Sequence, residues 1–235
     1  MPRTKKTEVV MPKVQKGNYL GVKLKVTFLD EVLGTCSADP NIHEEFIASK
    51  APDAPSKEEE VEALGVDEVT RKATTVFPRN AAGDPGFWNY QWRGYFKEAC
   101  SGLRRVKGSL SEGIKAYKKI IDLNVFVPNR FIPIVLPEGT KVGSCQRSLR
   151  AETAQGPRIS LANSETVPAG STCEFWVLLM NPTDVDVLLE WMSYGMVHGT
   201  GQWRNSGKGI FTYSVEEYRE IPLAGLGSFT AECNE

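Results

Sequence analysis

Alternation of apolar and polar positions marks the first patterned part of the chain. Leu20, Val22, Leu24, Val26 and Phe28 are separated by Gly21, Lys23, Lys25 and Thr27. Successive side chains of a strand point to opposite faces, so this pattern predicts a half-buried strand over Asn18–Phe28.

Further strands are predicted where apolar runs follow turn residues. Thr172–Met180 follows the turn Val167-Pro-Ala-Gly170, and Ile210–Val215 follows a glycine-rich segment. Leu123–Val127 and Phe131–Leu136 are also strand-like. Prolines 128, 133 and 137 have no backbone N–H, so we expect these two strands at a sheet edge or in a hairpin arm.

Helical spacing is clearest over Phe87–Arg105, where large apolar residues recur every three or four positions: Trp88, Trp92, Tyr95, Phe96, Ala99 and Leu103. A second helix is predicted after Asn181-Pro182, a favourable start, and it should stop at Gly195. Its inward positions are Val185, Leu188, Leu189, Trp191 and Met192.

The order strand, helix, strand, strand, helix, strand predicts an α+β protein with a ferredoxin-like, RRM-like antiparallel sheet and helices on one face. We expect a disordered basic arm over residues 1–16, one domain over 17–222, and a tail over 223–235. Within the domain, polar and Pro- or Gly-rich sequences predict an exposed insertion over Ala51–Leu64 and a mobile arm over Lys141–Ser160. The wider bounds, an insertion after the first strand at about 35–75 and a projecting β arm at about 125–160, are implied by the family resemblance described below.

Composition places the chain among ordinary globular proteins, with 41% hydrophobic and 24% charged residues. No run approaches the roughly 20 apolar residues of a membrane span, and the basic start lacks the apolar core of a secretory signal, so we expect a cytoplasmic protein without a membrane partner. Five scattered cysteines without a CxxC pair, and two histidines, predict reduced thiols and no metal or cofactor site.

The near-neutral net charge of −1 hides an uneven distribution along the chain. Residues 30–68 hold twelve acidic residues against two lysines, whereas residues 93–158 hold thirteen basic residues against five acidic ones. A strongly basic face is what a polyanion requires, although two solvated faces that attract one another explain the same pattern.

The segment from Gly199 to Gly209 carries the clearest candidate chemistry. Its glycines let the backbone approach a ligand, and exposed N–H groups in such a loop form anion-binding nests. Its spacing is neither a P-loop nor a dinucleotide fingerprint. A turn that merely packs on the sheet is the alternative, with Trp203 in the core. The candidate nucleic-acid contacts in this loop are Gly199, Gly201, Gln202, Trp203, Arg204, Asn205, Gly207, Lys208 and Gly209.

Residues outside the loop complete the predicted nucleic-acid site. Arg204 and Lys208 would contact phosphate, and Trp203 or Trp92 would stack on a base. The cations expected to line the path are Arg93, Lys97, Arg104, Arg105, Arg147 and Arg150.

Four segments resemble the RAMP superfamily, the RNA-binding subunits of CRISPR effector complexes. Gly199-x-Gly-x-x-Arg-x-x-Gly-x-Gly-x-Phe211 resembles the family's C-terminal glycine-rich loop, and Glu165–Phe175 its entry to the penultimate strand. Leu24–Gly34 resembles the first strand, and Gln91-Trp-Arg93-Gly94 stands at the step before the main helix. The family's proline-glycine-serine at that step is replaced here by Phe87-Trp-Asn-Tyr-Gln.

The resemblance implies a ferredoxin-like core over about residues 20–213 and a non-catalytic single-stranded nucleic-acid binder, RNA ahead of DNA. It also implies assembly of copies along the ligand, in a CRISPR complex or as a stand-alone relative from a phage or other mobile element. Two alternatives stay open. One is a protein that blocks or mimics a host defence complex through its acidic segment. The other is an endoribonuclease that uses Asp39 as a metal ligand or His198 as a general acid or base.

Overall fold

The computed structural model describes residues 9–38, 74–153 and 156–234, with residues 149–161 described by their backbone. The predicted insertion and Asp39 therefore lie largely outside the described residues. No helix in the described part of the chain is long and apolar enough to cross a membrane.

The main sheet is built around β1 (Asn18–Phe28), which has the bounds that its alternation predicts. The apolar positions of β1 are buried, and the strand pairs antiparallel with β10 (Thr172–Leu179) on one side and β11 (Phe211–Pro222) on the other. The order continues from β10 to β7 (Phe131–Val135) and β5 (Gly86–Trp88), while β6 (Val125–Phe126) also pairs with β10.

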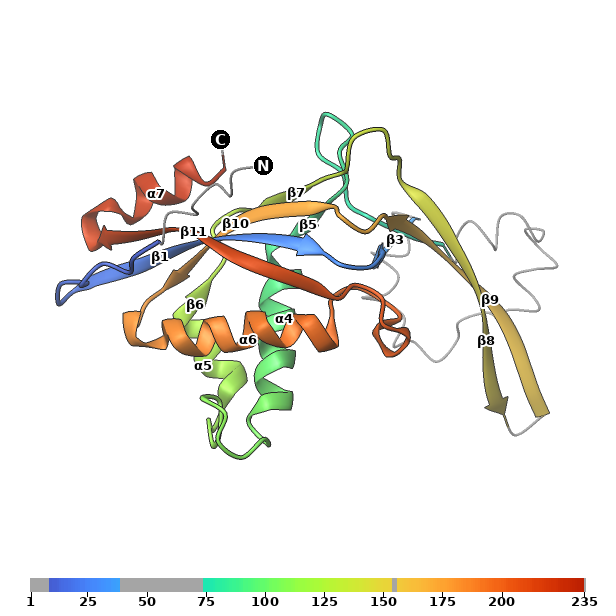
Figure 1. Cartoon of the computed structure of the whole chain (residues 1–235), viewed down its shortest axis with the longest axis horizontal. Helices are drawn as coiled ribbons and strands as arrows, with labels where there is room; N and C mark the ends of the chain where they lie inside the picture. Colours follow the sequence, from blue (N-terminus) through green and yellow to red (C-terminus); the bar gives the residue numbers. More distant parts are fainter. Residues whose placement is uncertain (1–8, 39–73, 154–155, 235) are drawn as a thin grey trace, which may run out of the picture.

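Helices α4 (Asn89–Leu103), α5 (Tyr117–Asn124) and α6 (Val185–His198) lie below the sheet in Figure 1. They contribute to one core with the inward side chains of β1, β10 and β11. Its centre is aromatic: the Trp92 ring centroid lies 4.5 Å from that of Phe175 and 5.6 Å from that of Phe211. The chain thus has the predicted α+β, ferredoxin-like arrangement, with the fourth, first, third and second core strands side by side.

Helix α7 (Leu226–Glu232), preceded by the short turn η3 (Leu223–Gly225), covers part of the other sheet face (Figure 1). Phe229 packs edge-on against Trp176 at 5.2 Å, within a small cluster that also contains Leu178 and Ile221. The end of the chain, which sequence patterns indicated as a tail, therefore adds an ordered helix to the fold.

A second sheet contains β2 (Val32–Leu33), β3 (Cys36–Ser37), β4 (Thr74–Val76), β8 (Gly143–Thr153) and β9 (Gly156–Val167). The β8–β9 hairpin projects beyond the main sheet in Figure 1. A projecting β arm was expected over about 125–160; the hairpin spans 143–167, because β6 and β7 belong to the main sheet. Near its base, Arg147 on β8 contacts Gln202 of the glycine-rich loop.

Two local predictions were wrong. Gly195 does not end α6, which continues to His198; a Cβ at Gly195 would lie 2.1 Å from the Phe211 ring, so this glycine permits close packing of α6 on β11. Strand β7 is not at an edge but between β10 and β5. Pro133 is tolerated opposite Gly86 because Ile134 N–H makes the neighbouring bond, to the Pro85 carbonyl at 2.8 Å.

Candidate nucleic-acid interface

The glycine-rich loop leaves α6 and folds back on itself before β11. Gly199, Gly201, Gly207 and Gly209 all have positive φ, as the composition predicted. Thr200 N–H donates to the Gly209 carbonyl at 2.9 Å, and Gly209 N–H donates to the Glu31 carbonyl at 2.8 Å. A Cβ at Gly209 would lie 1.8 Å from the Thr200 oxygen, so only glycine allows this closure.

Trp203 holds an unusual position in the loop. Its φ of 57° is in the left-handed region, which costs a bulky residue free energy and marks a position worth a functional explanation. The side chain is not in the core, because 41% of the residue is exposed. The guanidinium carbon of Arg147, on β8, lies 5.3 Å from the centre of its ring, within cation–π range.

Arg147 has guanidinium N–H groups that make no hydrogen bond. Its Nη2 donates to Gln202 Oε1 at 2.7 Å, but Nε and Nη1 are buried without a hydrogen-bond partner. No carboxylate of the described residues pairs with it. Buried polar groups are normally bonded, so these N–H groups indicate a missing acceptor.

A pocket of about 330 Å³ lies at this junction of hairpin and loop. We call it the Arg147 pocket; it is lined by Arg147, Gly201, Gln202, Trp203, Arg204 and Asn205. It combines an unpaired cation, amide groups and a half-exposed aromatic ring. That combination can hold an anionic group and a flat ring together.

The two cations within the loop are engaged by carboxylates. Arg204 Nη1 is hydrogen-bonded to Glu98 Oε2 on α4, and Lys208 Nζ lies 3.1 Å from Asp30 Oδ1 and 3.7 Å from Glu31 Oε1. The hydrogen bond with Asp30 raises the pKa of Lys208. A phosphate would therefore compete with these carboxylates, and both cations anchor the loop to its surroundings.

His198 belongs to the same anchor. Its Nε2 lies 2.9 Å from Arg204 Nη1 and 3.2 Å from Glu98 Oε1, and its ring stacks on Tyr194 at 4.9 Å. Burial acts to raise the pKa of Glu98, but the hydrogen bonds and charges of Arg204 and His198 outweigh burial and lower it. Of the two catalytic candidates, His198 is thus fixed within an ion-pair cluster, and Asp39 lies outside the described residues.

Helix α4 does not supply the path that its sequence suggested. Trp92 is only 1% exposed, so it is a core residue and cannot stack on a base in this structure. Arg93 Nη2 and Lys97 Nζ both bind Asp122 Oδ1 on α5, at 2.9 and 2.6 Å. These two cations hold the helices together on a side of α4 different from that of Glu98.

The remaining predicted cations lie apart. Arg104 lies over the Tyr117 ring at 5.2 Å, and Arg105 is exposed just after the end of α4. Arg150 is on the β8–β9 hairpin where side chains are not described. Of the cations predicted outside the loop, Arg147 is therefore the one that is placed against it.

Sequence reasoning missed the carboxylates that neutralise these cations. Glu98 and Arg204 are 106 positions apart, and Asp30 and Lys208 are 178 apart. No local pattern identifies such pairs.

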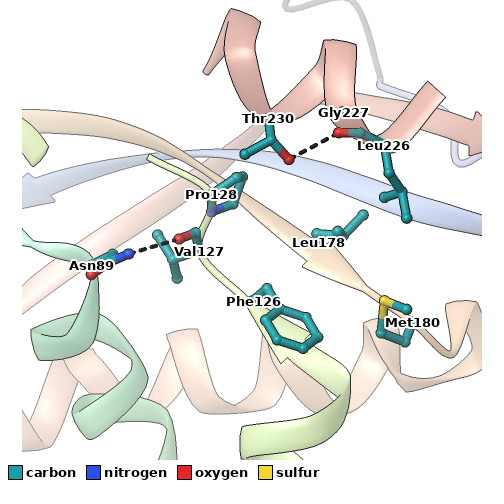
Figure 2. Close-up of a pocket in the computed structure, with 9 residues that line it drawn as sticks. All are labelled: Asn89, Phe126, Val127, Pro128, Leu178, Met180, Leu226, Gly227 and Thr230. Atoms are coloured by element: carbon teal, nitrogen blue, oxygen red, sulfur yellow. Dashed lines mark hydrogen bonds between the residues drawn. The ribbon is translucent and has the colours of Figure 1, made fainter. Parts of the chain in front are cut away.

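A larger hollow lies between α7 and the β6–β10 region (Figure 2). Its lining is mostly apolar: Phe126, Val127, Pro128, Leu178, Met180, Leu226 and Gly227, with Asn89 and Thr230. The two polar side chains already make hydrogen bonds within the protein. Asn89 Nδ2 donates to the Val127 carbonyl, and Thr230 Oγ1 donates to the Leu226 carbonyl. This hollow shares no residue with the Arg147 pocket and presents no charge.

No family model and no curated protein matches this chain. Among solved structures, it is similar to a chain of the structure described as type III-B Cmr-beta bound to cognate target RNA, with 10% identity and a TM-score of 0.50. The match covers 87% of this chain and 61% of that chain. The two chains share a fold. A chain of a type IV-B CRISPR complex also matches, with 12% identity, coverage of 83% and 90%, and a TM-score of 0.40.

At these identities the likeness concerns the fold alone. The chain spans about three fifths of the length of the matched Cmr-beta chain. The arrangement derived from the sequence pattern is therefore also found in a chain of the Cmr-beta structure. What the site binds has to be argued from its own residues.

Proposed function

We propose that this chain is a non-catalytic binder of single-stranded nucleic acid, with RNA preferred to DNA, and that the ligand contacts the Arg147 pocket. The observation that carries the proposal is the position of Arg147. Its unpaired N–H groups lie against the exposed ring of Trp203. The two loop cations, in contrast, are already bound to carboxylates.

The chemistry of the pocket favours an unpaired strand. An Arg guanidinium binds phosphate through charge-assisted hydrogen bonds, and an exposed indole stacks on a base. A base inside a duplex already stacks on its neighbours, so only a single strand, a loop or an end can offer one to Trp203. The amides of Gln202 and Asn205 add groups able to bond a base edge.

The preference for RNA and the setting rest on similarity of fold. The matched Cmr-beta structure is bound to cognate target RNA. We extend this to the present chain as membership of the RAMP superfamily, in a CRISPR-type complex or as a stand-alone relative. Assembly of several copies along one strand is part of the same proposal.

Fluorescence anisotropy with a labelled RNA of roughly 12 nucleotides, titrated over a salt series, tests the proposal. Wild-type protein should bind with an affinity that falls as salt rises, more tightly to RNA than to DNA of the same sequence. Arg147→Glu should abolish most of the binding. Lys118→Glu is the matched control, because this exposed lysine on α5 lies away from the pocket.

Three outcomes would count against the proposal. Binding that does not depend on salt would show that the protein makes no phosphate contact. Equal loss of affinity in Arg147→Glu and Lys118→Glu would show that the ligand does not bind specifically at the Arg147 pocket. Cleavage of the RNA during the titration would contradict the non-catalytic role.

A further inference from the structure

The side-chain amide of Gln202 has one allowed orientation. Arg147 Nη2 lies 2.7 Å from Oε1. An arginine side chain has five N–H donors and no acceptor, so only the amide oxygen can face it. A flipped amide would set donor against donor. The Nε2 amino group of Gln202 is therefore left for a ligand in the pocket.

The charged side chains that line the Arg147 pocket, Arg147 and Arg204, are hydrogen-bond donors as well. Arg147 keeps two N–H groups without a partner, and no carboxylate is among the lining residues. Glu98, the nearest carboxylate to Arg204, is already bonded to Arg204 and His198. Asn205 is exposed at the rim, and its amide can turn either way. A base in the pocket thus meets donors from the Gln202 and Arg147 side.

Bases differ in what they offer to such a lining. Guanine presents two adjacent acceptors, O6 and N7, on one edge, whereas adenine presents N7 beside an amino donor. A glutamine reads adenine by using its oxygen and its nitrogen together. In Gln202 the oxygen is taken by Arg147, so that pairing is weakened. On the edge that corresponds to O6 and N7 of guanine, cytosine presents an amino donor and uracil presents one carbonyl.

We infer that the Arg147 pocket selects guanine, and that Gln202, oriented by Arg147, is the residue that sets this preference. The inference rests on the proposed function. Trp203 stacks on any base, so it supplies affinity without selection. Arg147 acts twice: it bonds the strand, and it fixes the direction of the Gln202 amide.

The test uses a short pyrimidine-rich RNA with one variable position, bound to the full chain. Guanine should bind roughly tenfold more tightly than adenine, because adenine places an amino donor where guanine offers the acceptor O6 to the Gln202 amino group. Inosine keeps O6 and N7 and should bind like guanine. The analogue 7-deazaguanine lacks N7 and should lose most of the advantage.

Gln202→Leu should make the affinities for the guanine RNA and the adenine RNA equal, while the average affinity changes little. Gln146→Leu is the matched control on β8, where the exposed side chain at the neighbouring position should leave the ratio intact. Equal affinity for the RNAs with guanine, adenine, inosine and 7-deazaguanine would overturn the guanine preference. If Trp203→Gly still abolished that binding, the proposed function would stand. Failure of every RNA to bind would overturn the proposed function itself.

Discussion

Two regions of this molecule each combine cations with an indole, and they differ in what the fold leaves exposed and unpaired. On α4, Trp92 is 1% exposed, and Arg93 and Lys97 share the carboxylate of Asp122. At the loop, Trp203 is 41% exposed, and Arg147 keeps two unpaired N–H groups. Basic and aromatic content therefore does not identify an interface. Our proposed interface rests instead on an unpaired cation that lies beside an accessible ring.

The difference arises from the partners that the fold supplies. Helix α5 brings Asp122 against the basic side of α4, and the main sheet covers Trp92. The β8–β9 hairpin instead brings Arg147 to the loop, and none of the described carboxylates pairs with it. Substitutions at six positions test this difference between the two regions.

Trp92→Ala should have the largest effect, on stability alone. Removing a buried indole from among four aromatic rings should lower the free energy of unfolding by about 3–5 kcal/mol, measured by denaturant titration. Trp92→Phe should cost less than half as much, since the indole Nε1 has no hydrogen-bond partner to lose. A clear loss of RNA affinity in folded Trp92→Phe would show that this residue contacts the ligand after all.

Arg147→Glu should weaken RNA binding on the order of 30-fold, the value of a hydrogen bond to a charged group. It should also reduce the salt slope by about one phosphate contact. Stability should change little, because the arginine has no ion pair in the described structure to lose. An unchanged salt slope would contradict the assignment of Arg147 as the phosphate contact.

Trp203→Gly should cost about 1–3 kcal/mol of binding free energy through lost stacking. The folded protein should be no less stable in thermal unfolding, because glycine adopts the left-handed conformation of residue 203 without strain. Trp203→Ala keeps that strain and provides the comparison. A large drop in the melting temperature of the glycine variant would mean that the ring is part of the core.

Arg93→Gln and Lys97→Gln test the other side of the comparison. Each removes one bond to Asp122 and should cost less than about 1 kcal/mol of stability, as is usual for partly exposed pairs. RNA affinity should stay within about twofold of wild type, because salt screens the effect of a charge that lies far from the pocket. A strong decrease in affinity would restore α4 as part of the nucleic-acid path.

Glu98→Gln should have the smallest effect, and one that depends on pH. The folded pKa of Glu98 is lowered, so its carboxylate stabilises the fold above the unfolded value near 4.5 and loses that contribution as pH falls. At pH 7 the variant should melt slightly earlier than wild type, and in acid below the lowered pKa of Glu98 the two should coincide. A difference that grows in acid would reverse the assigned sign.

The fold was largely predictable because its signals are local. The alternation over β1, the helical spacing of α4 and the apolar run of β10 are each contained in about a dozen residues. Their order was enough to predict the ferredoxin-like sheet. Helix α7 left a weaker signal in the three-residue spacing of Leu226 and Phe229, which sequence reasoning did not use.

The site was less predictable because its contacts are long-range. Gly195 could not be recognised as a packing glycine until Phe211 was placed against it. Arg147 and Gln202 are 55 positions apart, and nothing near either residue indicates the other. Loop composition identified the glycines and Trp203. It could not tell which cations are already bound to carboxylates.

Photocrosslinking of an RNA that carries 4-thiouracil, followed by mass spectrometry of the protein, tests the central claim most directly. If RNA binds at the Arg147 pocket, we expect adducts on the loop at residues 202–205 and on the neighbouring part of β8 at residues 143–148. Adducts confined to α4 and the following turn, residues 93–119, would contradict it.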